Sequence, residues 1–427
     1  MAASADVKQP ERPKLIEVMG PGLITGASDD DPSGIATYSQ VGAQFGFGLG
    51  WTLVVTFPLM AAIQEIAARI GRVTGVGIAG NLARYYPAWL VNSAIALLIL
   101  ANVINIGADL GAMGAGLKLL IGGPALLYVV GFAIVSVLLE VFVRYSRYVS
   151  VLKYLTLSLL AYVATVFVVG TPWGEVLKNI VIPPFRFDKD YVLAITAVLG
   201  TTISPYLFFW QAEEEVEQEQ EKPEKAPLIE APQQAPNEFY RIRIDTVVGM
   251  ALSNLVALCI VVTAGATLNA HGHTDIQTSA EAAEALRPIA GPFAFALFAL
   301  GIIGTGLLAL PVLAGSAAYA LGEAMGWKVG LAQKANRAPA FYGAIAVAGL
   351  IGVVMNFSPI DPIRALFWSA VINGIVAVPI MTIMMLISRR RDIMGEFTLP
   401  MYLQALGWLA TVAMGATVVA LVVTAFL

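Results

Sequence analysis

One stretch of the chain combines cation-binding residue types with a place where charge is costly. Residues 26–34 read Gly-Ala-Ser-Asp-Asp-Asp-Pro-Ser-Gly, and apolar sequence runs before them (15–27) and after them (35–47). Carboxylates at membrane depth are costly and usually mark an ion or substrate path. Proline removes a backbone donor, and an interrupted helix leaves carbonyl oxygens free to coordinate a cation. The run therefore predicts a helix broken at mid-membrane, with Asp31 aimed at a cation.

Composition places this stretch in an integral membrane protein. Of 427 residues, 58% are hydrophobic and only 13% are charged, and the mean hydropathy is +0.77. Soluble domains carry about 25% charged residues. The net charge of -4 is too small to favour a nucleic-acid partner. Cys259 is the one cysteine in the sequence, which excludes an intramolecular disulfide.

The apolar segments predict an all-α fold with eleven transmembrane helices, the first broken near Asp31. We place them at 15–44, 48–68, 90–117, 124–143, 149–169, 191–211, 244–268, 289–321, 340–357, 363–387 and 401–426. Most of the 25 Lys and Arg residues fall between spans on one side, the side of the N-terminus. The positive-inside rule then predicts a cytoplasmic N-terminus and an extracellular C-terminus. We expect the protein in the bacterial plasma membrane.

A second interruption occurs at 200–206, Gly-Thr-Thr-Ile-Ser-Pro-Tyr, inside the sixth span. Five spans separate the starts of the two broken segments, so they enter the membrane from opposite sides. Paired breaks in two halves indicate an inverted-repeat transporter. We predict a cytoplasmic tail (1–14), then one transport domain (15–427). Its parts are repeat one (about 15–169), repeat two (about 191–387), an extra span (about 401–426) and a flexible, acidic cytoplasmic loop (about 213–238).

At these motifs the chain resembles the Nramp metal-ion transporter family. The resemblance includes Gly20-Pro21-Gly22, Asp31-Pro32, Ala108-Asp109-Leu110 and the break at Pro205, and it covers nearly the whole chain. It implies eleven spans, a five-plus-five inverted repeat of the leucine-transporter type with spans 1 and 6 broken, and alternating access. Typical members of the family carry Mn2+ or Fe2+ together with protons.

The chain departs from the family pattern where the family binds its ion. Gly34 stands where the family has Asn, Ser204 where it has Met, and Tyr206 where it has His, and Ala112 replaces a Glu common in span 3. These departures resemble the branch of Nramp-related magnesium transporters, whose members are taken to move Mg2+ without proton coupling.

The departures also have a direct chemical meaning. A thioether is a soft ligand that suits Mn2+, Fe2+ or Cd2+, whereas oxygen-only sites suit Mg2+ and Ca2+. Losing the Asn and Met side chains at Gly34 and Ser204 widens the site, and Mg2+ usually keeps several waters. Losing His and Glu removes two groups that relay protons.

The predicted metal site is led by Asp31, which would also serve as the N-cap of the second half-helix. By resemblance, Ser28 and Thr201 supply backbone carbonyls. Ser204 offers a hydroxyl, or is only a small residue that permits close packing. The set expected at the site is therefore Asp31, Ser28, Gly34, Thr201, Ser204 and Asn373. Asn373 lies near a family Gln that approaches the ion, and its alternative role is an interhelical hydrogen bond.

Four other acids stay open at this point: Asp29, Asp30, Asp109 and Glu140. Asp29 and Asp30 either line the path or are solvated in a vestibule. Asp109 matches a family position on the proton path but lacks its Glu partner. Glu65 and Arg69, four residues apart, are expected to pair near the inner end of span 2.

The functional prediction is transport of a divalent metal ion, Mg2+ first and Mn2+ second, without proton coupling. The alternatives are a proton-coupled Mn2+ or Fe2+ importer with a variant site and an organic-substrate transporter of the same architecture. Catalytic motifs such as a Ser-His-Asp set, His-Glu-x-x-His or a phosphate loop are not seen, so we expect no enzyme and no cofactor. The expected partners are the ion and the lipid bilayer, and we expect a monomer.

Overall fold

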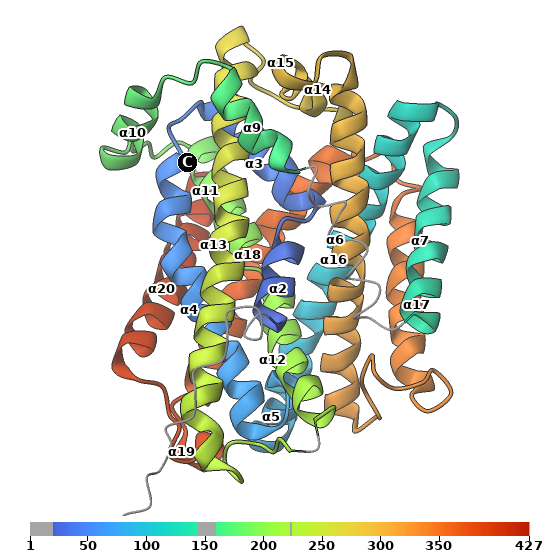
Figure 1. The fold of residues 1–427 in the computed structure, drawn as a ribbon, viewed down its shortest axis with the longest axis vertical. Coiled ribbons are helices and arrows are strands. Elements are labelled where there is room, and N and C mark those ends of the chain that lie inside the picture. The colour runs from blue at the N-terminus through green and yellow to red at the C-terminus, as the bar shows by residue number, and fades with distance from the viewer. Residues whose placement is uncertain (1–19, 144–158, 223, 427) are drawn as a thin grey trace, which may run out of the picture.

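The computed structural model describes residues 20–143, 159–222 and 224–426, and the regular elements in that part are all helical (Figure 1). The main helices in chain order are α2 (Pro21–Asp29), α3 (Pro32–Phe45), α4 (Gly50–Thr74), α5 (Ile78–Tyr85), α6 (Ala88–Ile121), α7 (Ala125–Phe142), α9 (Leu160–Val168), α10 (Trp173–Val181), α11 (Lys189–Thr202), α12 (Pro205–Gln220), α13 (Ala235–Thr267), α14 (Ser279–Glu284), α15 (Arg287–Ala290), α16 (Ala294–Met325), α17 (Pro339–Met355), α18 (Pro362–Ile387), α19 (Arg391–Met394) and α20 (Met401–Phe426).

The helix lengths confirm a membrane-spanning, all-helical fold. Among the described residues, 8 helices are long and apolar enough to cross a membrane, or 9 if α9 and α10, bent by 116°, count as one. The other predicted spans are shorter for identifiable reasons. The first is divided into α2 and α3, the fifth lies partly outside the described residues, and the ninth is the 17-residue helix α17.

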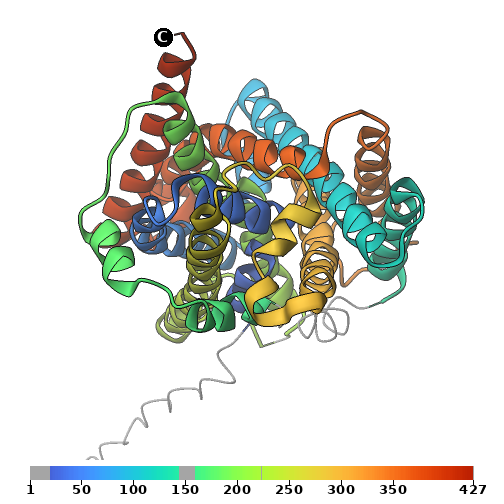
Figure 2. The ribbon, with the colours of Figure 1, turned by 90° about the horizontal axis from the view of Figure 1, so that it is seen from above.

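The two divided spans lie side by side in the middle of the bundle. Their upper halves, α3 and α11, pack together, and so do their lower halves, α2 and α12. Long helices surround them: α13 packs on α2 and α3, and α18 on α3, α6 and α11. Seen from above, α7 and α17 lie at one side of the bundle and α20 at the opposite side (Figure 2). This arrangement puts both predicted breaks at one central place.

The prediction of a flexible loop over 213–238 was wrong for most of its length. Helix α12 continues to Gln220, and α13 begins at Ala235. The segment between them is tied to α4, because the amides of Leu228 and Ile229 donate to the carbonyls of Arg72 and Val73. The run of glutamates indicated solvent exposure. In the structure, several of these glutamates are buried and are paired with basic and hydroxyl groups distant in the sequence, as described below.

Candidate functional site

The first break has the geometry of a helix start built on Asp31. Helix α2 ends at Asp29, Asp31 adopts an extended conformation (φ -68, ψ 171), and Pro32 opens α3. The Asp31 Oδ1 atom accepts a hydrogen bond from the Gly34 amide at 2.7 Å. Asp31 is 1% exposed, so this capping carboxylate lies inside the protein. The carboxylate thus has the capping role expected from Asp-Pro, at a buried position.

The second oxygen of Asp31 joins three further helices. Its Oδ2 accepts hydrogen bonds from Asn105 Nδ2 of α6 and from the Tyr206 hydroxyl of α12, each at 3.1 Å. The Oδ1 of Asn105 in turn accepts from the Ser369 hydroxyl of α18 at 2.6 Å. One buried carboxylate therefore connects α3, α6, α12 and α18.

The second break begins α12 at Pro205, the residue before Tyr206. Ser204 precedes it in an extended conformation and shares its hydroxyl hydrogen between the carbonyls of Gly200 (2.7 Å) and Thr201 (2.9 Å). These carbonyls belong to the last turn of α11. The structure therefore uses the predicted Ser204 hydroxyl to cap α11, and the predicted Thr201 carbonyl accepts from Ser204.

Tyr206 lies between two of the predicted ligands. Its hydroxyl is 3.1 Å from Asp31 Oδ2 and 3.5 Å from the Ser28 carbonyl oxygen. The Ser28 hydroxyl is used within α2, where it donates to the Ile24 carbonyl, so its carbonyl is the group that faces the break. Three oxygen atoms, from Ser28, Asp31 and Tyr206, thus meet at the junction of α2, α3 and α12.

Gly34 is required by the closeness of the two breaks. A Cβ at this position would lie 3.3 Å from the Asp29 carbonyl oxygen and 3.4 Å from the Thr201 hydroxyl oxygen. Any side chain here would need its neighbours to shift. We predicted that Gly34 widens the site because it lacks a side chain. In the structure the space beside it is filled, and Gly34 contributes its backbone amide, which donates to Asp31.

Asn373 is a buried amide without partners near the same helices. Both of its side-chain polar atoms lack hydrogen bonds in the described part of the chain, and the residue is buried. Its neighbour Gly374 packs against the backbone of α11 near Thr196 and Gly200. Among the described residues no hydrogen bond joins Asn373 to Asp31. The predicted interhelical hydrogen bond is likewise not formed.

Asn105 and Ser369 are the groups around Asp31 that sequence reasoning missed. Helix α6 carries Asn102, Asn105 and Asp109 at helical spacing on an otherwise apolar segment, and all three are fully buried. That polar stripe was the signal in the sequence. Asp109 itself has no hydrogen-bond partner on either oxygen in the described residues.

The remaining acids separate into other places. Glu65 and Arg69 pair at 2.7 Å as predicted. Glu140 accepts from the Ser136 hydroxyl at 2.9 Å on α7, a helix at the side of the bundle. Asp29 and Asp30 are buried rather than solvated, and both face α13.

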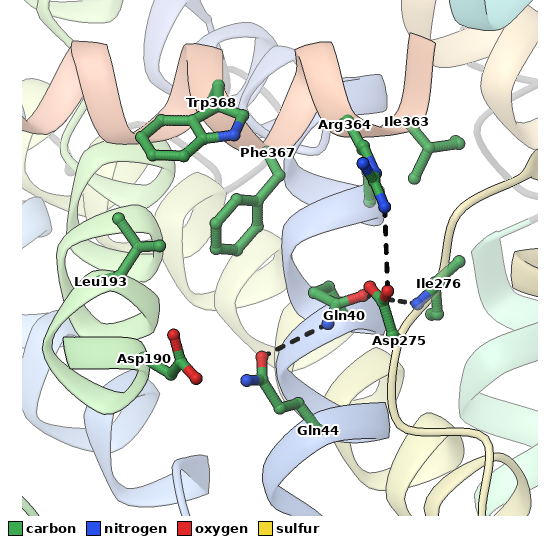
Figure 3. Close-up of a pocket in the computed structure, with 11 residues that line it drawn as sticks. Gln40, Gln44, Asp190, Leu193, Asp275, Ile276, Ile363, Arg364, Phe367 and Trp368 are labelled. Atoms are coloured by element: carbon green, nitrogen blue, oxygen red, sulfur yellow. Dashed lines mark hydrogen bonds and ion pairs between the residues drawn. The ribbon is translucent and has the colours of Figure 1, made fainter. Parts of the chain in front are cut away.

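A cavity of about 200 Å³, lined by both apolar and polar side chains, opens on the upper side of the breaks (Figure 3). It lies between α3, α11 and α18, and Gln40, Gln44 and Asp190 supply its polar side. Arg364 at its rim is 3.9 Å from Asp275. Ala36, one of its lining residues, lies on α3, the helix that Asp31 caps, so the cavity and the site share this helix.

The lower side is closed by buried ion pairs. The fully buried Arg72 binds Glu219 at 2.8 Å and Glu238 at 3.2 Å, and Lys225 binds Glu238 at 2.7 Å. Burial lowers the pKa of Lys225, and its hydrogen bond with Glu238 partly opposes that shift. Arg241 pairs with Glu238 and Glu215. Three glutamates of the predicted loop, Glu215, Glu219 and Glu238, are thus structural partners of Arg72 and Arg241.

The lower end of α2 is held by Asp245 of α13. Its carboxylate accepts from the amides of Gly20 (2.8 Å), Gly22 (2.7 Å) and Leu23 (3.1 Å). These are the free amides at a helix start, where a carboxylate is favourable. The site therefore has a cavity above and a fastened half-helix below.

Comparison with known proteins gives one family match over most of the chain. The family described as Nramp, natural resistance-associated macrophage protein-like, matches residues 22–424. A curated relative, the divalent metal cation transporter MntH of Verminephrobacter eiseniae, is 27% identical over 302 residues, or 69% of this chain and 65% of the relative. The aligned part thus spans about two-thirds of that relative's length.

Solved structures agree on the fold. A manganese transporter of Eremococcus coleocola, in complex with an aromatic bis-isothiourea compound, superposes with a TM-score of 0.76 at 16% identity, covering 96% of this chain and 88% of that one. Mhp1, a nucleobase-cation-symport-1 family transporter in a closed conformation, superposes with a TM-score of 0.56 at 13% identity, covering 95% and 93%. At these identities the likeness concerns the fold alone.

Proposed function

This chain belongs to the Nramp family, and from that premise we propose that it transports a divalent metal cation, Mg2+ before other ions, by alternating access and without proton coupling. Mn2+ is the second ion on this proposal. The protein is accordingly a transporter and not an enzyme, and the metal is its cargo and not a cofactor. Its curated relatives are named as divalent metal cation transporters, which supports the coarser part of the proposal.

The observation that carries the proposal is the oxygen triangle of Asp31, Tyr206 and Ser28. The Tyr206 oxygen lies 3.1 Å and 3.5 Å from the other two. Neighbouring ligands of an octahedral ion with metal–oxygen distances of about 2.1 Å are about 3 Å apart. The Tyr206 oxygen is therefore spaced from each of the other two oxygen atoms roughly as adjacent ligands of a hard cation are, with water for the remaining positions. Asp31 supplies the charge.

Selectivity for a hard ion follows from the same residues. The groups that contact Asp31 present oxygen and nitrogen atoms, and Ser204 replaces the thioether position of the family. With oxygen as the donor, soft ions lose the ligand that favours them over Mg2+. Among the described residues no group of three or more His, Cys, Asp or Glu is arranged to bind a metal. A site with one carboxylate suits an ion that keeps part of its hydration shell.

The polar approach and the fastened lower half fit alternating access. The ion would enter through the cavity beside Gln44 and Asp190, and release would require α2 to part from α13. On this view repeats 15–169 and 191–387 move relative to each other, with 401–426 as an added span. We propose that the chain works as a monomer in the bacterial plasma membrane, with the N-terminus in the cytoplasm.

A proton-coupled Mn2+ or Fe2+ importer is the competing function. The buried, unpartnered Asp109 favours it, because an intramembrane acid of this kind is suited to carry protons. Flux of Mg2+, Mn2+ and Fe2+ into proteoliposomes, with the internal pH recorded, separates the two. Mg2+ uptake without acidification supports our proposal. Acidification that tracks uptake of Mn2+, with no Mg2+ uptake, overturns it.

A further inference from the structure

The three adjacent aspartates of the break face two different sides of the molecule. Asp31 faces α6 and α12, as described above. The Ser253 hydroxyl of α13 lies 2.5 Å from Asp29 Oδ2 and 3.2 Å from Asp30 Oδ1. The break therefore presents one carboxylate to the site described above and two carboxylates to α13.

The position of α2 relative to α13 is fixed by close backbone packing one helical turn below Asp29, Asp30 and Ser253. A Cβ at Gly26 would lie 2.4 Å from the backbone of Gly249, so the two helices touch there without side chains. Both α2 and α13 run upward from their first residues (Figure 1). One turn further along each helix, Asp29 and Asp30 meet Ser253. The register is thus set by the contact of two glycines.

The charge of this pair has no protein counterion. Asp29 and Asp30 are 1% and 6% exposed, and no ion pair involves either of them among the described residues. They lie at the C-terminal end of α2, where the helix dipole disfavours negative charge, and its last turn has no basic residue. Buried charges without a partner are very costly, so these two carboxyl groups are stable either when protonated or when a positive group lies beside them.

Asp29 and Asp30 also have too few hydrogen-bond donors around them. Ser253 has one hydroxyl hydrogen and so can donate to only one of the two carboxylates at a time. Asp29 Oδ1 is buried with no hydrogen-bond partner in the described part of the chain. Asp31, in contrast, accepts three hydrogen bonds. The unmet demand for positive charge is greater at Asp29 and Asp30.

We propose that Asp29, Asp30 and Ser253 form a second binding site for a hard divalent cation, on the α13 side of the break. Two carboxylates balance a double charge, and all three donors are oxygen atoms, as Mg2+ and Ca2+ prefer. The distances of 2.5 and 3.2 Å bracket the spacing of about 3 Å between neighbouring ligands of such an ion. The identity of the ion rests on the proposed function; the existence of the site does not.

The test counts ions bound to the full-length purified chain, with Mn2+ as the probe and Mg2+ as the competitor. Equilibrium dialysis should give two ions per chain for the wild type. The double variant Asp29→Asn/Asp30→Asn should bind one ion, and Asp31→Asn should also bind one. Ser253→Ala should weaken the second site by up to about tenfold, as expected for one hydrogen-bonding group. Thr263→Val, which removes another buried hydroxyl of α13, should bind two ions as the wild type does.

Anomalous diffraction from Mn2+-soaked crystals of the unaltered chain tests the same point without variants. Two peaks, one on each side of the break, support the second site. A single ion that is lost in Asp31→Asn and kept in the double variant overturns the second site and leaves the proposed transport intact. A single ion that is kept in Asp31→Asn and lost in the double variant supports the second site and overturns Asp31 as the ligand of the cargo.

Discussion

The hydroxyl of Tyr206 donates to the carboxylate of Asp31 across the two breaks, at 3.1 Å. It thereby joins the start of α12 to the start of α3 at the place where we expect the ion. In the ion-free protein this hydrogen bond helps to compensate a buried charge. When the ion binds, the same oxygen can turn its lone pair to the metal.

Replacing Tyr206 by Phe should lower the free energy of unfolding of the ion-free protein by about 1.5–3 kcal/mol, because a hydrogen bond to a charged group is lost. Saturating Mg2+ should widen this difference, because the variant lacks one of the oxygen atoms proposed to bind the ion and is therefore stabilised less by it. Thermal unfolding in detergent, with and without Mg2+, measures both effects. Tyr162→Phe, at another buried tyrosine, should show no Mg2+-dependent difference. If Tyr206→Phe lowers the free energy of unfolding equally with and without Mg2+, Tyr206 does not interact with the ion.

Replacing Asp31 by Asn should reduce Mg2+ flux by about tenfold or more, which corresponds to about 1.4 kcal/mol of lost interaction. The chain contains a matched control. Asp361 also precedes a proline and also caps its helix, accepting from the Ile363 amide at 2.9 Å. Asp361→Asn should therefore keep flux near the wild-type level. If both variants transport equally well, Asp31 is only a capping residue.

Replacing Ser204 by Met should raise the ability of Cd2+ and Mn2+ to compete with Mg2+, by about tenfold for Cd2+, because a soft thioether enters an oxygen site. Competition of each ion against Mg2+ flux is the measurement. Ser204→Ala controls for the loss of the hydroxyl that caps α11. The proposal of an oxygen-selected site fails here if Ser204→Met and Ser204→Ala have the same ion preference.

Replacing Arg72 by Ala should destabilise the protein by about 3–5 kcal/mol, because Glu219 is left buried without its ion-pair partner and Glu238 keeps only Lys225 and Arg241. Arg390→Ala breaks the exposed pair with Asp392 and should cost less than about 1 kcal/mol. Chemical or thermal unfolding of both variants makes the comparison. Similar losses in the two would show that the lower network does not depend on burial.

The proposed orientation predicts which introduced thiols react from which side of the cell. A cysteine at exposed Gln277, before α14, should react with an impermeant reagent added outside intact cells. A cysteine at exposed Glu396, after α19, should react only after the membrane is opened. Replacing Cys259 by Ser first removes the native thiol. The reverse pattern would invert the proposed topology.

Both breaks could be predicted from sequence because their signals are local. Asp31-Pro32 and Ser204-Pro205 each begin a helix inside an apolar segment, and the structure confirms both starts. The contacts of Asp31 depend instead on pairing between helices far apart in the chain. Asn105 and Ser369 are single polar residues in apolar helices, and nothing in their neighbourhood reveals which atom they reach.

For the acidic segment after Pro205, the local sequence signal was misleading. Its composition is typical of solvated linkers, yet Glu217 accepts from the Leu331 amide at 2.6 Å and from the Tyr319 hydroxyl. Glu215 is paired with Arg241 in the next long helix. Composition cannot distinguish a solvated acid from one whose partner is supplied by the tertiary fold.

The amides of Gly20, Gly22 and Leu23 that Asp245 holds belong to the same half-helix whose Gly26 touches Gly249. The lower end of α2 is therefore held against α13 by one anion and by a contact between two residues without side chains, beside the buried ion pairs of Arg72 and Arg241. A methyl group added at Gly26 or Gly249 would clash with the facing backbone and push α2 away from α13, which under the proposed alternating access favours the state that is open on the lower side.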